Sequence, residues 1–192
     1  MASRRTAGAE VTVSSPPTPP AIESINALSP AEAEAAFAPL FEGAPRFLAR
    51  LVAARPFESW PAVFDVARSI AHAMPEPEQV ELVDAHPRLG APPGSVSVLS
   101  FVEQGYDREA AEGAAEAERE RVDAELERLN RAYEGRFGFR YCVFVAGRPR
   151  GELLAGFEAA LSAERGAELA RALDAVVDIA ADRWRRSAMG TG

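Results

Sequence analysis

Residues 163–186, AERGAELARALDAVVDIAADRWRR, decide the fold of this chain. Their apolar positions recur every three or four residues, which is the spacing of one buried face of an α-helix. Charged residues occupy the other side, so the segment predicts a long amphipathic helix whose apolar face needs other helices to cover it. The residues of that face are Leu169, Leu173, Val176, Val177, Ala180 and Trp184.

Helical patterns also fill most of the chain before this segment. Ser29-Pro30-Ala31-Glu32 combines a capping Ser, a Pro at the first helical position and a Glu at the third. Pro56 ends a second helix, because proline disfavours helical geometry in the residue before it. The stretch 137–145 has the only β-like pattern. We therefore predict an all-α fold, a single compact domain of about seven or eight helices. The clearest helices span about 29–41, 44–55, 59–74, 78–85, 107–134, 151–161 and 163–186.

The composition divides the chain into three parts. Residues 1–24 are rich in Ser, Pro and Ala, and such a segment buries too little apolar surface to fold, so we predict a disordered tail. Residues 25–186 form the helical domain, and residues 187–192 a flexible C-terminus. No apolar stretch approaches the ~20 residues of a membrane-spanning helix, and no apolar region follows the first arginines as in a secretory signal. We expect a cytoplasmic protein without membrane contacts.

The residue inventory excludes several classes of protein. All 21 basic residues are arginine, which excludes Schiff-base chemistry on a lysine and the lysine of a phosphate-binding loop. The single cysteine, Cys142, allows no internal disulfide, and together with two histidines it makes no recognisable set of metal ligands. It lies in an apolar run, where a buried reduced thiol is expected. With 29 acidic residues the net charge is −8, which argues against a nucleic-acid partner.

His86 is the first candidate for chemistry. It follows a predicted helix, precedes Pro87 and faces a loop, residues 88–99, that contains two prolines and two glycines. The negative end of the helix dipole raises the pKa of a histidine at this place, which suits a group that transfers protons. The alternative is a capping histidine that bonds the last carbonyls of the helix. The other histidine, His72, lies beside an apolar stripe and is expected to pack or to face solvent.

Three further features are candidates for a site. Ser100 and Glu103 have the spacing of a capping box, and a glutamate held in this way still presents an oxygen to a ligand. Gly138 lies between two phenylalanines, which indicates close approach of the backbone to another element or to a ligand. The alternative is that these rings simply fill the core. Arg183 on the last helix is the third, and a surface salt bridge is its alternative.

Several motifs occur in a fixed order along the chain, and together they resemble the signature of the 2-oxo-4-hydroxy-4-carboxy-5-ureidoimidazoline (OHCU) decarboxylase family. The similarity covers about residues 25–185. The motifs are Arg55-Pro56-Phe57, His86-Pro87-Arg88-Leu89-Gly90, Ser100-x-x-Glu103-Gln104, Leu129-Asn130-x-x-Tyr133-x-x-Arg136-Phe137-Gly138-Phe139 and Ile179-Ala180-x-x-Arg183.

This resemblance implies an all-α enzyme without a cofactor or a metal, typically a homodimer. It would convert OHCU to (S)-allantoin and carbon dioxide, the last step of urate degradation. The resemblance assigns the catalytic histidine to His86 and the essential carboxylate to Glu103. It also implies that substrate is contacted by Pro87, Ser100, Phe101, Val102, Gln104, Phe139, Tyr141, Cys142, Val143, Phe144, Val145 and Arg183.

Two residues depart from the family pattern. Arg140 and Tyr141 stand where many members have Pro and Phe, and the added charge of Arg140 either aids an anionic substrate or faces solvent. The loop between His86 and Ser100 is also shorter than in many members. Three other functions stay open: a catalytically silent helical binding or scaffold domain, a related ureide or imidazolone enzyme, and a metalloenzyme.

Overall fold

The computed structural model describes residues 20–105 and 116–189, and within these ranges the chain is helical with no β-strand. The prediction of an all-α fold is confirmed. The short helices α1 and α6 add to the seven predicted ranges. The elements are α1 (Ile22–Ala27), α2 (Pro30–Phe37), α3 (Pro45–Ala53), α4 (Trp60–Ala73), α5 (Glu76–Asp84), a 3-10 turn (Pro93–Ser95), α6 (Val98–Glu103), α8 (Glu116–Phe137), α9 (Arg150–Ala160) and α10 (Arg165–Met189).

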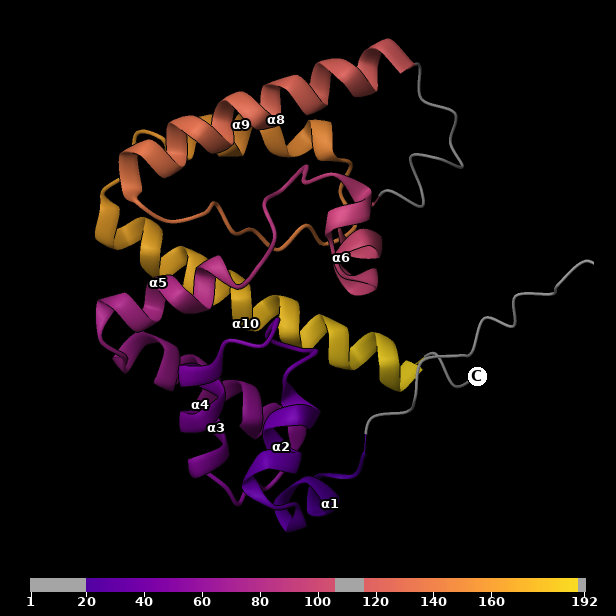
Figure 1. Ribbon diagram of the computed structural model, residues 1–192, viewed down its shortest axis with the longest axis vertical. Helices are drawn as coiled ribbons and strands as arrows, with labels where there is room; N and C mark the ends of the chain where they lie inside the picture. Colours follow the sequence, from indigo (N-terminus) through magenta and orange to yellow (C-terminus); the bar gives the residue numbers. More distant parts are fainter. Residues whose placement is uncertain (1–19, 106–115, 190–192) are drawn as a thin grey trace, which may run out of the picture.

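Helix α10 lies at the centre of the molecule. Figure 1 shows it crossing between the N-terminal helices α1–α4 on one side and α8 and α9 on the other. Five of its six predicted apolar positions are buried, and the sixth, Trp184, is partly buried and stacks on Trp60 of α4 with ring centroids 5.7 Å apart. Helix α10 also packs against α5, and its Glu168 accepts a hydrogen bond from Tyr133 of α8 at 2.8 Å, so it contacts helices on both of its sides.

The folded part of the chain begins earlier than predicted. Helix α1 starts at Ile22, and both Ile22 and Ile25 are buried, so residues 22–24 do not belong to a tail. The indole N–H of Trp60 donates a hydrogen bond to the carbonyl of Pro20 at 3.0 Å. The composition of residues 1–24 does not indicate this helix, because only two isoleucines form its buried face and the predicted tail ends between them. The rest of the predicted tail, residues 1–19, lies outside the described residues.

Local sequence sets most helix ends. The capping box at α2 is present: the Ser29 backbone N–H donates to the Glu32 carboxylate at 2.9 Å, and the Glu32 backbone N–H donates to the Ser29 hydroxyl at 3.4 Å. Helix α2 ends at Phe37 instead of near residue 41, and residues 38–43 form turns. The predicted start of the long charged helix, residues 107–115, lies outside the described residues.

The segment between α8 and α9 contains no strand, although residues 137–145 have a β-like pattern. Its apolar side chains pack into the core, where the ring of Tyr141 stacks on Phe157 with centroids 3.7 Å apart. Helix α8 ends at Phe137, and the next residue, Gly138, has a φ of +76° and donates its N–H to the Glu134 carbonyl at 2.8 Å. A Cβ at Gly138 would meet nothing within 4 Å, so the predicted close approach to another element is not found among the described residues. This glycine provides the left-handed turn that ends the helix.

None of the described helices is both long enough and apolar enough to cross a membrane.

Candidate active site

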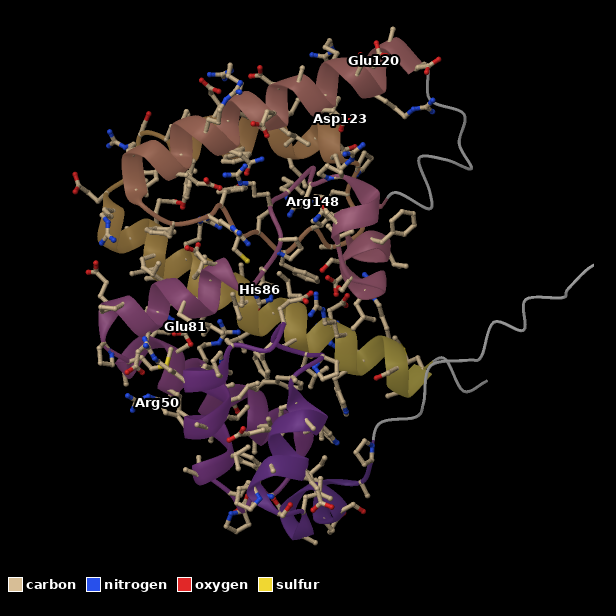
Figure 2. All side chains as sticks on the ribbon, in the orientation of Figure 1. Arg50, Glu81, His86, Glu120, Asp123 and Arg148 are labelled. Carbon is tan, nitrogen blue, oxygen red and sulfur yellow. The ribbon has the colours of Figure 1, made fainter. Side chains whose placement is uncertain are left out.

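A cavity lies between the end of α5, helix α6, residues 141–146 (the wall segment) and helix α10. The cavity is small and partly open. Figure 2 places His86 beside α10, near the middle of the molecule. The lining residues are His86, Pro87, Leu89, Ser100, Glu103, Gln104, Tyr141, Cys142, Val143, Phe144, Val145, Ala146, Ile179, Arg183 and Arg186.

Eleven of the fourteen predicted site residues line this cavity, and Phe101, Val102 and Phe139 do not. On α6, Ser100, Glu103 and Gln104 share one helical face, whereas Val102 is 37 % exposed on another. Phe139 is buried against the ring of Tyr133 instead. The lining residues that the sequence did not indicate are Leu89, Ala146, Ile179 and Arg186.

His86 follows the last turn of α5, and its ring is buried. The ring nitrogen Nδ1 lies 3.4 Å from the carbonyl oxygen of Leu82. A carbonyl only accepts hydrogen bonds, so this contact favours the tautomer with its proton on Nδ1. The other nitrogen, Nε2, is buried and has no hydrogen-bond partner among the described residues. His86 thus contacts the helix end through Nδ1, lines the cavity, and has an Nε2 atom that no described residue bonds.

Burial, and after it the nearby Arg183 guanidinium, lower the pKa of His86 to about 4. The carboxylate of Glu42 and the carbonyl of Leu82 act in the opposite direction but are weaker. The prediction of a raised pKa is therefore wrong, because loss of water around the ring outweighs the favourable end of the helix. His86 is a neutral imidazole at neutral pH.

Arg183 is buried on α10, so the alternative of a surface salt bridge is wrong. Its Nε and one terminal nitrogen donate to the two carboxylate oxygens of Glu103, at 2.6 and 2.7 Å. Such a paired geometry fixes both side chains in one orientation. Burial raises the pKa of Glu103 above its usual value, although Arg183 opposes this. The cavity therefore contains a carboxyl group of unusually high proton affinity, held by a fixed cation.

A second carboxylate, that of Glu42, contacts the same guanidinium at 2.6 Å. The hydroxyl of Ser100 donates to the same Glu42 oxygen at 2.7 Å. Although burial alone raises the pKa of Glu42, the Arg183 charge and the Ser100 hydroxyl bring it below its usual value. The sequence analysis missed this residue, which lies in the turns after α2. The pair Glu42-Gly43 is the single local signal there, and it indicates only a turn.

The predicted capping box at Ser100 is wrong, because α6 begins one turn earlier. Ser97 is the N-cap, and its hydroxyl accepts the Ser100 backbone N–H at 3.1 Å. This leaves the Ser100 hydroxyl and the Glu103 carboxylate available for other partners. Gln104 connects α6 to the loop after His86: its amide accepts the Gly90 N–H at 2.8 Å and donates to the Arg88 carbonyl at 3.1 Å.

Two arginines hold the backbone of the wall segment. Arg171 donates to the Cys142 carbonyl at 2.9 Å. Arg148, labelled in Figure 2, donates to the carbonyls of Phe144 and Val145 at 2.7 and 3.0 Å. Burial raises the pKa of the Cys142 thiol to about 12, so this side chain lines the cavity as a neutral group.

Arg140 does not line the cavity. Its guanidinium donates to the backbone carbonyls of Asp84 and His86, at 2.7 and 2.9 Å. The backbone N–H of Arg140 donates to the Asp84 carboxylate at 2.8 Å. Its charge is used at the C-terminal end of α5, although the residue remains partly exposed.

The remaining candidates lie outside the cavity. His72 is partly exposed, and its Nε2 lies 2.9 Å from Asp174. In the part of the chain that the structure describes, no group of three or more His, Cys, Asp or Glu side chains is placed to hold a metal ion.

The arrangement suits proton transfer to and from a small polar molecule. A neutral imidazole with an available lone pair acts as a base, and a carboxyl group nearby orients or protonates the same ligand. Both groups are held by fixed partners, and the cavity wall is largely apolar, which strengthens electrostatic interactions inside it.

Comparisons with known proteins identify the family and the fold. A family model described as OHCU decarboxylase matches residues 26–185. The crystal structure of (S)-allantoin synthase is similar with a TM-score of 0.59 and 20 % identity, over 88 % of this chain and 54 % of that one. This chain thus spans about half the length of that relative. The crystal structure of OHCU decarboxylase in the presence of (S)-allantoin has a TM-score of 0.59 and 21 % identity, over 79 % of this chain and 96 % of that one. No curated protein matches the sequence.

Proposed function

This chain belongs to the OHCU decarboxylase family, and we propose that it removes the carboxylate from C4 of OHCU to form (S)-allantoin and carbon dioxide. The observation that carries the proposal is that His86, with an unpaired buried Nε2, and Glu103 line the same cavity. These are the two groups to which the family resemblance assigns the chemistry.

The first step assigned to the protein is the removal of a proton. Neutral His86 accepts the proton of the C4 hydroxyl through Nε2, while Glu103 holds that hydroxyl in place. As the bond from C4 to the carboxylate breaks, its electron pair moves into the adjacent ring carbon–nitrogen double bond. The substrate therefore supplies its own electron sink, and the role of the protein is to orient groups and move protons.

The second step sets the configuration of the product. A proton delivered to one face of C5 gives the S isomer, the ring nitrogen of the former carbon–nitrogen double bond takes up a second proton, and a C4 carbonyl forms as the hydroxyl proton leaves. Starting from the carboxylate, the reaction takes up one proton in total. Pro87, Ser100, Gln104 and the wall segment would contact the ring and its ureido group. We assign no substrate contact to Phe101, Val102 and Phe139, which lie outside the cavity.

The test follows OHCU, generated in situ from urate, together with the circular dichroism of the allantoin formed. We expect the protein to accelerate OHCU loss and to give a single enantiomer, whereas spontaneous decay gives a racemate. His86→Asn and Glu103→Gln should each lower kcat/KM by about 10²–10⁴-fold. His72→Asn is the matched control, because His72 lies outside the cavity. A His86→Asn variant that still gives pure (S)-allantoin at the normal rate would contradict the role of His86.

We also propose that the protein works as a homodimer in the cytoplasm, as the family resemblance implies. Size-exclusion chromatography with light scattering measures the first property, and cell fractionation the second. A monomer at micromolar concentration would contradict the proposed homodimer. Recovery of the protein outside the cytoplasm would contradict the proposed location.

A further inference from the structure

Glu42 has a backbone conformation that glutamate rarely adopts. Its φ is +52°, in the left-handed region, and the next residue, Gly43, has a φ of +77°. A glycine at position 42 would adopt this turn without strain. A side chain is retained in such a conformation only where surrounding contacts hold it, and these positions cluster at functional sites. The contacts of the Glu42 carboxylate therefore need an explanation.

That carboxylate lies where α2, α6 and α10 come together, and its side chain is 16 % exposed. One of its oxygens, Oε1, accepts three hydrogen bonds: from Ser100 at 2.7 Å, from Ser97 at 3.1 Å and from Arg183 at 2.6 Å. Two of these donors, Ser100 and Arg183, line the cavity, whereas Glu42 does not. Glu42 thus connects two parts of the cavity lining from outside it.

The guanidinium of Arg183 is fully occupied by this arrangement. Its five N–H groups have acceptors in Glu103, Glu42 and the carbonyls of Pro39 and Leu40, with the Ser100 oxygen as a further neighbour at 3.2 Å. An oxygen of a substrate can therefore bind Arg183 only in exchange for one of these acceptors. The orientation of Glu103, whose two oxygens both contact Arg183, depends on where this guanidinium is held.

We propose that Glu42 is a positioning residue of the active site, which holds Arg183 and Ser100 so that the Glu103 carboxyl group faces the cavity beside His86. This inference rests on the proposed function for its effect on turnover, but the geometry that it assigns is independent of the substrate. The left-handed turn places the carboxylate, and the two serines and the arginine keep it there.

The charge of Glu42 also acts on His86. The charged and polar groups that influence the His86 ring are Arg183, which disfavours the imidazolium, and Glu42 and the Leu82 carbonyl, which favour it. When the negative charge of Glu42 is removed, less of the positive potential of Arg183 at the His86 ring is cancelled. The pKa of His86 should then fall further, whereas a merely structural loss at position 42 would let water reach the ring and raise it.

Three substitutions at this position separate charge, length and backbone strain. Glu42→Gln keeps the shape but removes the charge, Glu42→Asp keeps the charge, and Glu42→Gly relieves the left-handed backbone while removing the carboxylate. We expect kcat/KM to fall about ten- to a hundredfold in Glu42→Gln, mainly through kcat, with partial recovery in Glu42→Asp. Glu42→Gly should lose as much activity, and relief of the left-handed strain should offset only part of the stability that is lost with the buried ion pair. Glu78→Gln is the matched control, since Glu78 also pairs with an arginine, Arg50, at a similar exposure of 20 %.

A second readout does not depend on activity. Because the chain has two histidines, the ring Cε1–H resonances of His86 and His72 can be assigned from a His72→Asn variant and followed by NMR as pH changes. In Glu42→Gln the midpoint for His86 should move to lower pH, and in Glu42→Asp it should stay in place. An unchanged His86 midpoint together with normal kcat/KM in Glu42→Gln would overturn the positioning role. The expected shift in a protein that does not process OHCU would support the geometry and refute the proposed function instead.

Discussion

Arg140 donates a hydrogen bond to the backbone carbonyl of His86 at 2.9 Å, and so connects the segment after α8 to the residue at the end of α5. A second bond, at 2.7 Å, reaches the carbonyl of Asp84. Carbonyls at a helix C-terminus have no partner within the helix, and a cation there also complements the helix dipole. Arg140 therefore holds the backbone from which the His86 ring extends.

Replacement of Arg140 by Met should reduce both stability and turnover. The loss of two hydrogen bonds from a charged donor should lower the free energy of unfolding by about 1–3 kcal/mol, and kcat should fall because His86 is less well held. Urea denaturation and OHCU assays measure the two effects. Arg131→Met is the control, because Arg131 makes only an exposed pair with Glu127 at 3.6 Å. If the two variants have equal unfolding free energies and equal kcat values, the contact of Arg140 with His86 affects neither stability nor turnover.

Gln104 should affect substrate binding more than chemistry. Its amide fixes the loop that carries the cavity residues Pro87 and Leu89, so Gln104→Ala should raise KM several-fold with a smaller change in kcat. Gln79→Ala is a close match, because Gln79 donates to the carbonyls of Ala71 and His72 at 3.0 and 3.1 Å, away from the cavity. Steady-state kinetics measure KM and kcat of both variants. An equal rise of KM in both would count against a role of this loop in substrate binding.

Gly90 and Gly138 should respond differently to alanine. Both have positive φ, but a Cβ at Gly90 would lie 2.8 Å from a methyl carbon of Leu126, whereas one at Gly138 would meet nothing within 4 Å. Gly138→Ala should cost only the backbone strain, about 1 kcal/mol of unfolding free energy. Gly90→Ala adds a clash in the core and should cost about 1–3 kcal/mol more. Thermal or urea unfolding measures this difference, and equal losses would contradict it.

His86 should make stability depend on pH in a predictable direction. The pKa of His86 is about 4 in the folded protein and 6.5 for an unperturbed histidine, so the unfolded state binds more protons between these limits. The stabilising contribution is complete above pH 6.5 and is lost as pH falls toward 4. From about pH 7.5 to about pH 5 this residue alone should remove about 2 kcal/mol from the free energy of unfolding. Urea unfolding of the wild type and of His86→Asn at these two pH values tests this prediction. Between them, the free energy of unfolding of the wild type should fall by about 2 kcal/mol more than that of His86→Asn.

The long helices are predictable from the sequence because their apolar spacing is regular over many turns. Helix α10 and the capping box of α2 are examples in which local pattern and observed structure agree. The short helices are different. The buried face of α1 depends on two isoleucines, and the start of α6 is set by Ser97 because Ser100 is bound by Glu42 and Arg183 from distant parts of the chain.

The site is predictable to the extent that motifs mark it. His86, Glu103 and Arg183 occur in family motifs, and the structure brings them to one cavity. The direction of the His86 pKa shift is not predictable locally, because burial by other helices decides it. Glu42 is hidden for a similar reason: its importance arises from a left-handed turn and from partners 55 to 141 residues away in the sequence.

The order of these residues along the chain has a consequence for biosynthesis. Both glutamates are translated before Arg183, which belongs to α10. A nascent polypeptide without α10 would have to bring two acids together with no cation between them, and their repulsion opposes premature closure of that region. Completion of α10 supplies the missing charge and the central packing surface at once, so the reaction chamber assembles only after this helix has been made.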